Sequence, residues 1–160
     1  MKRLIYFALT ICCISCADKK QDSSLKLLLS NQLKYSYDNE NWFAPAKTTL
    51  AGLTSEQFNW TDSSKNHSIG EIVSHLTFWN EMQLKAFKGE DFTNFEIDNR
   101  TTFESYSAEE MENVISKLDS IQSELLQLIE NGTESELSEL ADDILSLASH
   151  NAYHSGQIIY

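Results

Sequence analysis

The chain has 160 residues, 41% of them hydrophobic, which suits one globular domain with a single core. Its formal net charge is −12, and no stripe of lysine or arginine occurs along it, so the sequence excludes nucleic acid as a partner. All three cysteines, Cys12, Cys13 and Cys16, lie near the N-terminus. The rest of the chain therefore offers no thiol for a disulfide, a nucleophile or a metal ligand.

Residues 1–16 have the pattern of a lipoprotein-type signal peptide. A basic start precedes an apolar run, residues 4–14, that is too short to span a bilayer. The sequence Cys13-Ile-Ser-Cys16 resembles a bacterial lipoprotein cleavage box, so we expect Cys16 to become the lipid-bearing N-terminus. The protein would then be exported and anchored, through this lipid alone, to a membrane of a bacterial cell envelope. The alternative is ordinary cleavage near Ala17, which would give a soluble secreted protein.

Residues 17–24 are polar and without period, which predicts a short tether. Helical spacing of leucines then predicts a first helix that begins near Ser24. A second helical segment is expected over residues 42–53, where Trp42 and Phe43 would anchor the core.

The next long helix is predicted to begin at Ser68, because Ser68 and Glu71 have the spacing of a capping box. This helix should end near Gly89. Residues 90–106 contain aromatic side chains without a sustained period, which predicts a long crossing loop.

A third helix is predicted over residues 108–130, and a fourth is predicted to begin near Thr133 or Ser135. The predicted fold is all-α: residues 25–160 form a four-helix bundle with a long loop between its second and third helices.

The fourth helix carries His150 and His154, which lie one turn apart, so both imidazoles can reach one metal ion. His75 shares the apolar face of its helix with Ile72 and Leu76, and a buried imidazole needs either a hydrogen-bond partner or a metal. We therefore predict a metal site of His75, His150 and His154. The alternatives are surface histidines for the pair and a hydrogen-bonded core histidine for His75.

Two segments resemble the signature segments of the DinB-like (YfiT-like) superfamily. They are His67-Ser-Ile-Gly-Glu-Ile-Val-Ser-His75-Leu-Thr-Phe-Trp79 and His150-Asn-Ala-Tyr-His154-Ser-Gly-Gln-Ile158. Residues 41–45 and 50–57 extend the resemblance, which covers roughly residues 25–160. It implies a four-helix bundle that binds one divalent metal ion through three histidines, here His75, His150 and His154. Such bundles often dimerise, so a homodimer is a further expectation.

Other polar residues could support the site. Glu71 lies one turn before His75 and could accept a hydrogen bond from it, although capping alone explains this residue. His67 could approach the metal or pack against the first turn of the helix. Asp143 and Ser146 precede His150 by seven and four residues, so either side chain could touch a metal-bound water. Surface exposure is the alternative for both.

Three histidine ligands leave a divalent ion with open positions, as in catalytic sites. We therefore expect a metal-dependent hydrolase of a small substrate, with zinc, nickel or iron as the ion and with no catalytic residue assigned. A non-catalytic metal- or ligand-binding module tethered to a membrane is an equal alternative. A thiol-dependent transferase ranks lower, because an exported protein would generally lack a pool of small thiols.

Overall fold

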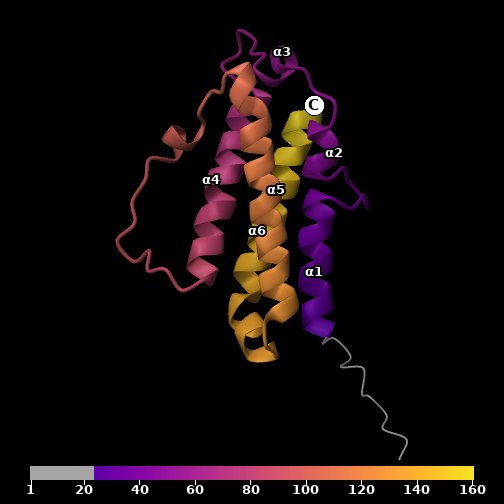
Figure 1. Cartoon of the computed structure of the whole chain (residues 1–160), viewed down its shortest axis with the longest axis vertical. Helices are drawn as coiled ribbons and strands as arrows, with labels where there is room; N and C mark the ends of the chain where they lie inside the picture. Colours follow the sequence, from indigo (N-terminus) through magenta and orange to yellow (C-terminus); the bar gives the residue numbers. More distant parts are fainter. Residues whose placement is uncertain (1–23) are drawn as a thin grey trace, which may run out of the picture.

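The computed structural model describes residues 24–160, so the predicted signal peptide with Cys16, and residues 17–23 of the predicted tether, lie outside the described residues. Within this range the chain is helical and contains no strand, which confirms the all-α prediction. Four long helices form a bundle (Figure 1). Their bounds are α1 Ser24–Tyr37, α4 Ile69–Phe87, α5 Ala108–Asn131 and α6 Glu134–Ile159. The short helices are α2 Ala46–Leu50, α3 Ser55–Phe58 and the 3-10 turn η1 Asn99–Thr102.

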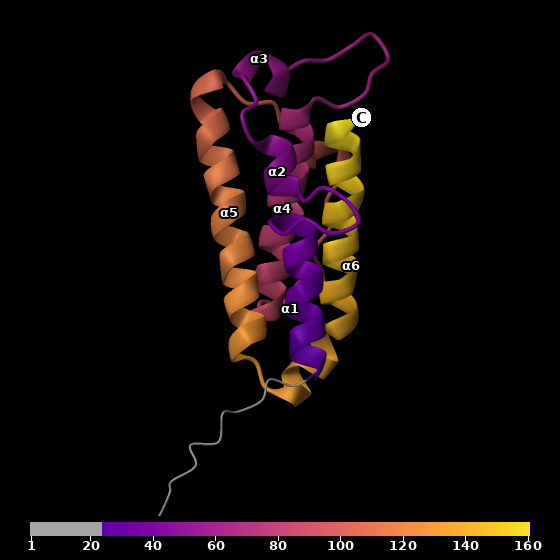
Figure 2. The same cartoon turned by 90° about the vertical axis from the view of Figure 1, so that its right-hand side faces the viewer.

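In the views of Figures 1 and 2, α1 and α6 run upward, and α4 and α5 run downward. One core cluster contains Val73 near the start of α4, Val114 near the start of α5 and Ile158 at the end of α6. A second cluster contains Leu84 near the end of α4 and Ile129 near the end of α5. Hence α4 and α5 run parallel, and α6 runs antiparallel to both.

The parallel arrangement explains the long connection between α4 and α5. Parallel neighbours cannot be joined by a tight turn, so the chain from Lys88 to Ser107 must return along the length of the bundle. Figure 1 shows this connection passing along the outer side of α4. It includes η1, and the crossing loop predicted from the sequence is therefore present.

Local signals fix the helix ends. The predicted capping box is confirmed: the Ser68 hydroxyl accepts from the Glu71 backbone N–H at 3.1 Å, and the Glu71 carboxylate accepts from the Ser68 N–H at 2.9 Å. Thr133 and Glu136 form an equivalent capping box at the start of α6. Gly89 follows α4 with a φ of +89°, a left-handed conformation that favours glycine and ends the helix.

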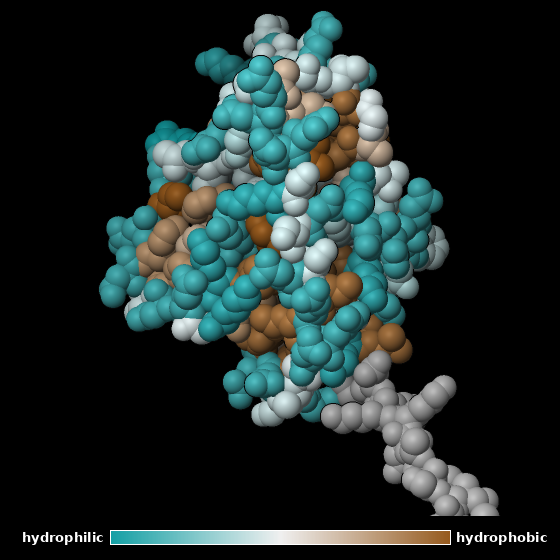
Figure 3. Space-filling view, viewed as in Figure 1, coloured by the Kyte–Doolittle hydropathy of each residue, from teal (hydrophilic) through white to brown (hydrophobic). Residues whose placement is uncertain are grey.

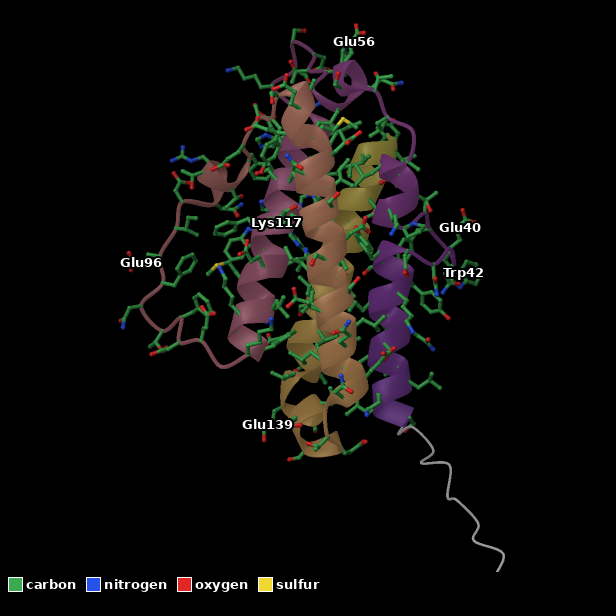
Figure 4. The ribbon with its side chains drawn as sticks, in the orientation of Figure 1. Glu40, Trp42, Glu56, Glu96, Lys117 and Glu139 are labelled. Atoms are coloured by element: carbon green, nitrogen blue, oxygen red, sulfur yellow. The ribbon has the colours of Figure 1, made fainter. Side chains whose placement is uncertain are left out.

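The prediction for residues 42–53 was wrong in two respects. Only Ala46–Leu50 is helical, because Pro45 lacks an N–H, disfavours helix in the residue before it and stands as N-cap. Trp42 is 95% exposed and Phe43 is 42% exposed, so neither anchors the core. Figure 4 shows Trp42 on the loop between α1 and α2, pointing away from the bundle. The helix α3 was not predicted.

The face of the molecule seen in Figure 1 carries mostly hydrophilic side chains, with smaller hydrophobic areas between them (Figure 3). Among residues 24–160, no helix has both the length and the apolar character needed to cross a bilayer. The long helices instead bury their apolar faces against one another.

A buried amide network ties three of the long helices together. The Asn80 amide nitrogen donates to the Asn151 side-chain oxygen at 2.8 Å, and the Asn151 amide nitrogen donates to the Asn80 oxygen at 3.1 Å. The Gln122 amide nitrogen donates to the same Asn80 oxygen at 2.6 Å. Asn80 and Asn151 are 0% and 1% exposed, so these hydrogen bonds form away from water and link α4, α5 and α6.

Replacing Asn80 by alanine should leave the Asn151 and Gln122 side chains without their shared partner in the core. We expect Asn80→Ala to lower the free energy of unfolding by about 2–4 kcal/mol, measured by denaturant unfolding. Asn131→Ala is the control, because the Asn131 side chain is exposed and bonds only the Gln127 carbonyl. Equal effects of the two substitutions would contradict a special role for the network.

Candidate metal centre

Two antiparallel helices bring the three predicted histidines together. His75 lies on α4, and His150 and His154 lie one turn apart on the neighbouring helix α6. The His150 Nε2 atom is 3.1 Å from the Nε2 atom of His75 and 3.1 Å from that of His154. One ring nitrogen from each histidine lies within 4.8 Å of the other two, an arrangement that could hold a metal ion.

The protonation of His75 can be assigned from its neighbours. The Thr102 hydroxyl donates to the Asn99 carbonyl at 2.7 Å, so its oxygen is an acceptor toward the His75 Nδ1 atom at 2.6 Å. His75 therefore carries its proton on Nδ1, and the lone pair on Nε2 faces the other two histidines.

Hydrogen bonds alone cannot satisfy the cluster. His150 Nε2 has one position for either a proton or a lone pair, yet it faces both other Nε2 atoms. A proton there can serve only one of the two contacts, and the other contact then lacks a complementary partner. A shared cation removes this conflict, because all three lone pairs can point to it.

The spacing of the nitrogens also fits a metal. Zinc–nitrogen bonds of about 2.0–2.1 Å in tetrahedral geometry place neighbouring ligand nitrogens roughly 3.3 Å apart. The two 3.1 Å separations are close to that value. The donor set therefore fits a divalent ion with three imidazole ligands.

Burial keeps the imidazoles neutral. Desolvation lowers the pKa of His75 to about 4, with further lowering by His154, His150 and His67. Desolvation and then His150 lower the pKa of His154 to about 4, against an opposing effect of Gln157, and burial lowers the pKa of His150. All three rings thus offer lone pairs at neutral pH without first losing a proton.

Of the two roles considered for Glu71, the structure shows the capping role. Its carboxylate accepts from the Ser68 N–H and lies 3.2 Å from the His67 Nδ1 atom, whereas the His75 Nδ1 atom bonds Thr102. Glu71 is therefore a capping residue whose carboxylate also contacts the His67 ring, and it does not orient His75.

His67 is likewise outside the cluster. Its ring stacks on Phe103 at 3.8 Å between centroids, and the other face of Phe103 lies near His75 at 4.2 Å. The three rings form a stack in which Phe103 separates the His67 ring from the His75 ring. His67 thus packs the crossing loop onto the site.

Sequence reasoning missed Thr102 as a partner of His75 and did not separate Phe103 from the other loop aromatics. Thr102 is 2% exposed and ends η1, inside the loop that lacks helical period. In the sequence, the only signal for Thr102 and Phe103 was their position in a long loop with aromatic side chains. That position does not reveal which loop residues reach the site.

Two hollows adjoin the histidines. One, of about 330 Å³, is lined by His75 and His150 together with Asp143 and Ser146. The other, of about 1080 Å³, is lined by His154 and extends past Phe103 toward the end of α6. The fold and the site thus define a helical-bundle protein with a three-histidine cluster, able to hold a metal ion, beside open space for a small molecule.

A family model described as the DinB superfamily matches residues 44–158. That range covers most of the chain and contains all three clustered histidines, so the chain belongs to the DinB superfamily, as its signature segments predicted. A search of curated proteins and a search of solved structures each found no match.

Thr102 should matter for metal affinity because it holds the proton and the orientation of His75. We expect Thr102→Val to weaken zinc binding by about 10- to 100-fold, measured by competition with a chromophoric chelator. Thr102→Ser should restore the affinity because it keeps the hydroxyl.

The matched control is Thr101→Val, since Thr101 is exposed and its hydroxyl bonds only the Asp98 carbonyl. Zinc affinity should stay within about twofold of wild type in this control. Unchanged affinity in Thr102→Val, or equal losses in both valine variants, would rule out the positioning role.

Proposed function

We propose that His75, His150 and His154 hold one divalent metal ion and that the protein is a metal-dependent hydrolase of a small substrate. The observation that carries this proposal is the convergence of three neutral imidazoles beside an open hollow of about 330 Å³. A structural zinc site is normally closed by four protein ligands, whereas three ligands leave a position for substrate or water.

A divalent ion at this position would polarise a carbonyl group and lower the pKa of water. Hydrolysis of an ester or amide adds the hydroxyl of water to the carbonyl carbon and the proton to the leaving alcohol or amine. The residues of the chain have separate tasks in this reaction: the three imidazoles hold the ion, Thr102 orients His75, and Phe103 covers one face of the His75 ring.

A non-catalytic metal-binding module is the second candidate. It is supported by the surroundings of the imidazoles: among residues 24–160, no carboxylate takes part in their hydrogen bonds or ring contacts, which involve Thr102, Gln157, aromatic side chains and one another. Glu71 is engaged at the helix cap, and Asp143 lies about 10 Å along α6 from His150. Proton transfer would then depend on water or on the substrate itself.

The test combines metal content with turnover. Natively purified protein should contain about one equivalent of zinc, nickel or iron, and His75→Ala should lose it, because two ligands from α6 alone bind weakly. Chelation and His75→Ala should both abolish hydrolysis in a screen of small esters, amides and lactams, measured by release of alcohol or amine.

Asn131→Ala is the control, since Asn131 is exposed at the far end of α5 from the site and should leave the metal content unchanged. Full metal content in His75→Ala would contradict the site. One metal equivalent without any turnover would favour the non-catalytic module.

We also propose that the protein is exported and held at a bacterial membrane by a lipid on Cys16. The pattern of residues 1–16 supports this location. Cys16→Ser should move the protein from the membrane fraction to the soluble fraction, measured by cell fractionation and immunoblotting. An unchanged membrane fraction would contradict lipid attachment at Cys16.

A further inference from the structure

The hollow beside His75 and His150 extends along two helices as a cleft. On α4, His75, Trp79 and Gln83 follow at intervals of four residues, and all three line the cleft. The antiparallel helix α6 contributes Asp143 and Ser146 below His150. Asp143 lies seven residues before His150, which is about 10 Å along the helix and on nearly the same face.

The polar side chains at the far end of this cleft have no partners among the described residues. In residues 24–160, the side chains of Gln83, Asp143 and Ser146 make no hydrogen bond or ion pair. Trp79 differs, because its indole N–H donates to the Asn99 side-chain oxygen at 3.0 Å. That hydrogen bond holds the ring in place at the cleft, with its N–H already satisfied.

The charged side chains at the cleft indicate which kind of ligand it can bind. Asp143 is the only charged side chain among the residues that line the cleft, and no lysine or arginine is among them. Nearby cations on α4 and α5 are engaged elsewhere: Lys85 and Lys117 both pair with Glu81, at 3.0 Å and 2.5 Å. Figure 4 shows Lys117 on α5. With a net charge of −12 on the chain, the Asp143 end of the cleft, about 10 Å along α6 from His150, favours a cation and disfavours an anion.

We propose that the Asp143 end of this cleft binds an ammonium group. The substrate is then a small, elongated cation whose ammonium group lies against Asp143 and Trp79. Its carbonyl group is about 10 Å away, at the three histidines. The carboxylate offers charge pairing and the indole offers a cation–π surface. A volume of about 330 Å³ suits a molecule of this size. This assignment of the substrate class rests on the proposed function of the histidine site.

The test uses choline and its neutral isostere 3,3-dimethylbutan-1-ol as probes, because neither can be hydrolysed. Binding is followed through the indole N–H signals of the three tryptophans in nitrogen-15-labelled protein. The Trp79 signal, assigned with Trp79→Phe, should shift with choline, whereas those of Trp42 and Trp60 should not. Choline should bind roughly tenfold more tightly than the neutral alcohol.

Two matched variants test whether the Asp143 carboxylate causes the preference for choline. Asp143→Asn should remove the preference for choline, while Asp142→Asn should keep it, because Asp142 is an adjacent exposed carboxylate that does not line the cleft. Both changes alter the net charge equally. Equal affinity of the two alcohols, no shift at Trp79, or equal losses in both variants would overturn the proposal.

The experiments distinguish a failure of the ammonium site from a failure of the proposed hydrolase function. A protein that binds choline at Trp79 but hydrolyses nothing retains the ammonium site and loses the hydrolase assignment. A protein that hydrolyses neutral esters in a metal-dependent manner but does not prefer choline loses only the ammonium site.

Discussion

Bringing three imidazoles together at one point, two of them buried and one half-buried, is the constraint on which the site depends. Each neutral ring keeps a polar nitrogen that is costly to leave unpaired in the core. The cluster tolerates this only if α4 and α6 keep their register, since a shift of one residue would turn the histidines away from each other. The mutual hydrogen bonds of Asn80 and Asn151 hold this register close to the histidines, because Asn151 directly follows His150.

The parallel course of α4 and α5 has a functional consequence. It requires a connection that returns along the bundle, and that connection carries Thr102 to the Nδ1 atom of His75 and Phe103 to the face of its ring. The loop thus supplies the contacts that orient one imidazole of the cluster and shield it from solvent. The connection between α4 and α5 therefore completes the surroundings of the histidine cluster, which the helices alone would leave open.

The sequence predicted most of the helical framework because all four long helices have apolar periodicity, and α4, α5 and α6 add a capping box. The convergence of His75, His150 and His154 was predictable for a similar reason, since spacing and the resemblance to the DinB superfamily agree. Trp42 and Phe43 were misjudged because apolar character alone does not reveal which side of a loop faces the core. Thr102 was missed because contacts between a loop and a helix leave no period in the sequence.

X-ray absorption spectroscopy of the zinc-loaded protein tests the three-histidine centre most directly, because it counts the imidazoles around the ion. Three imidazole nitrogens at about 2.0–2.1 Å, with the remaining coordination from oxygen, are the predicted result. His75→Ala should reduce that number to two or abolish binding. Fewer than three imidazoles in the wild-type protein, or a spectrum unchanged by the substitution, would contradict a metal centre shared by α4 and α6.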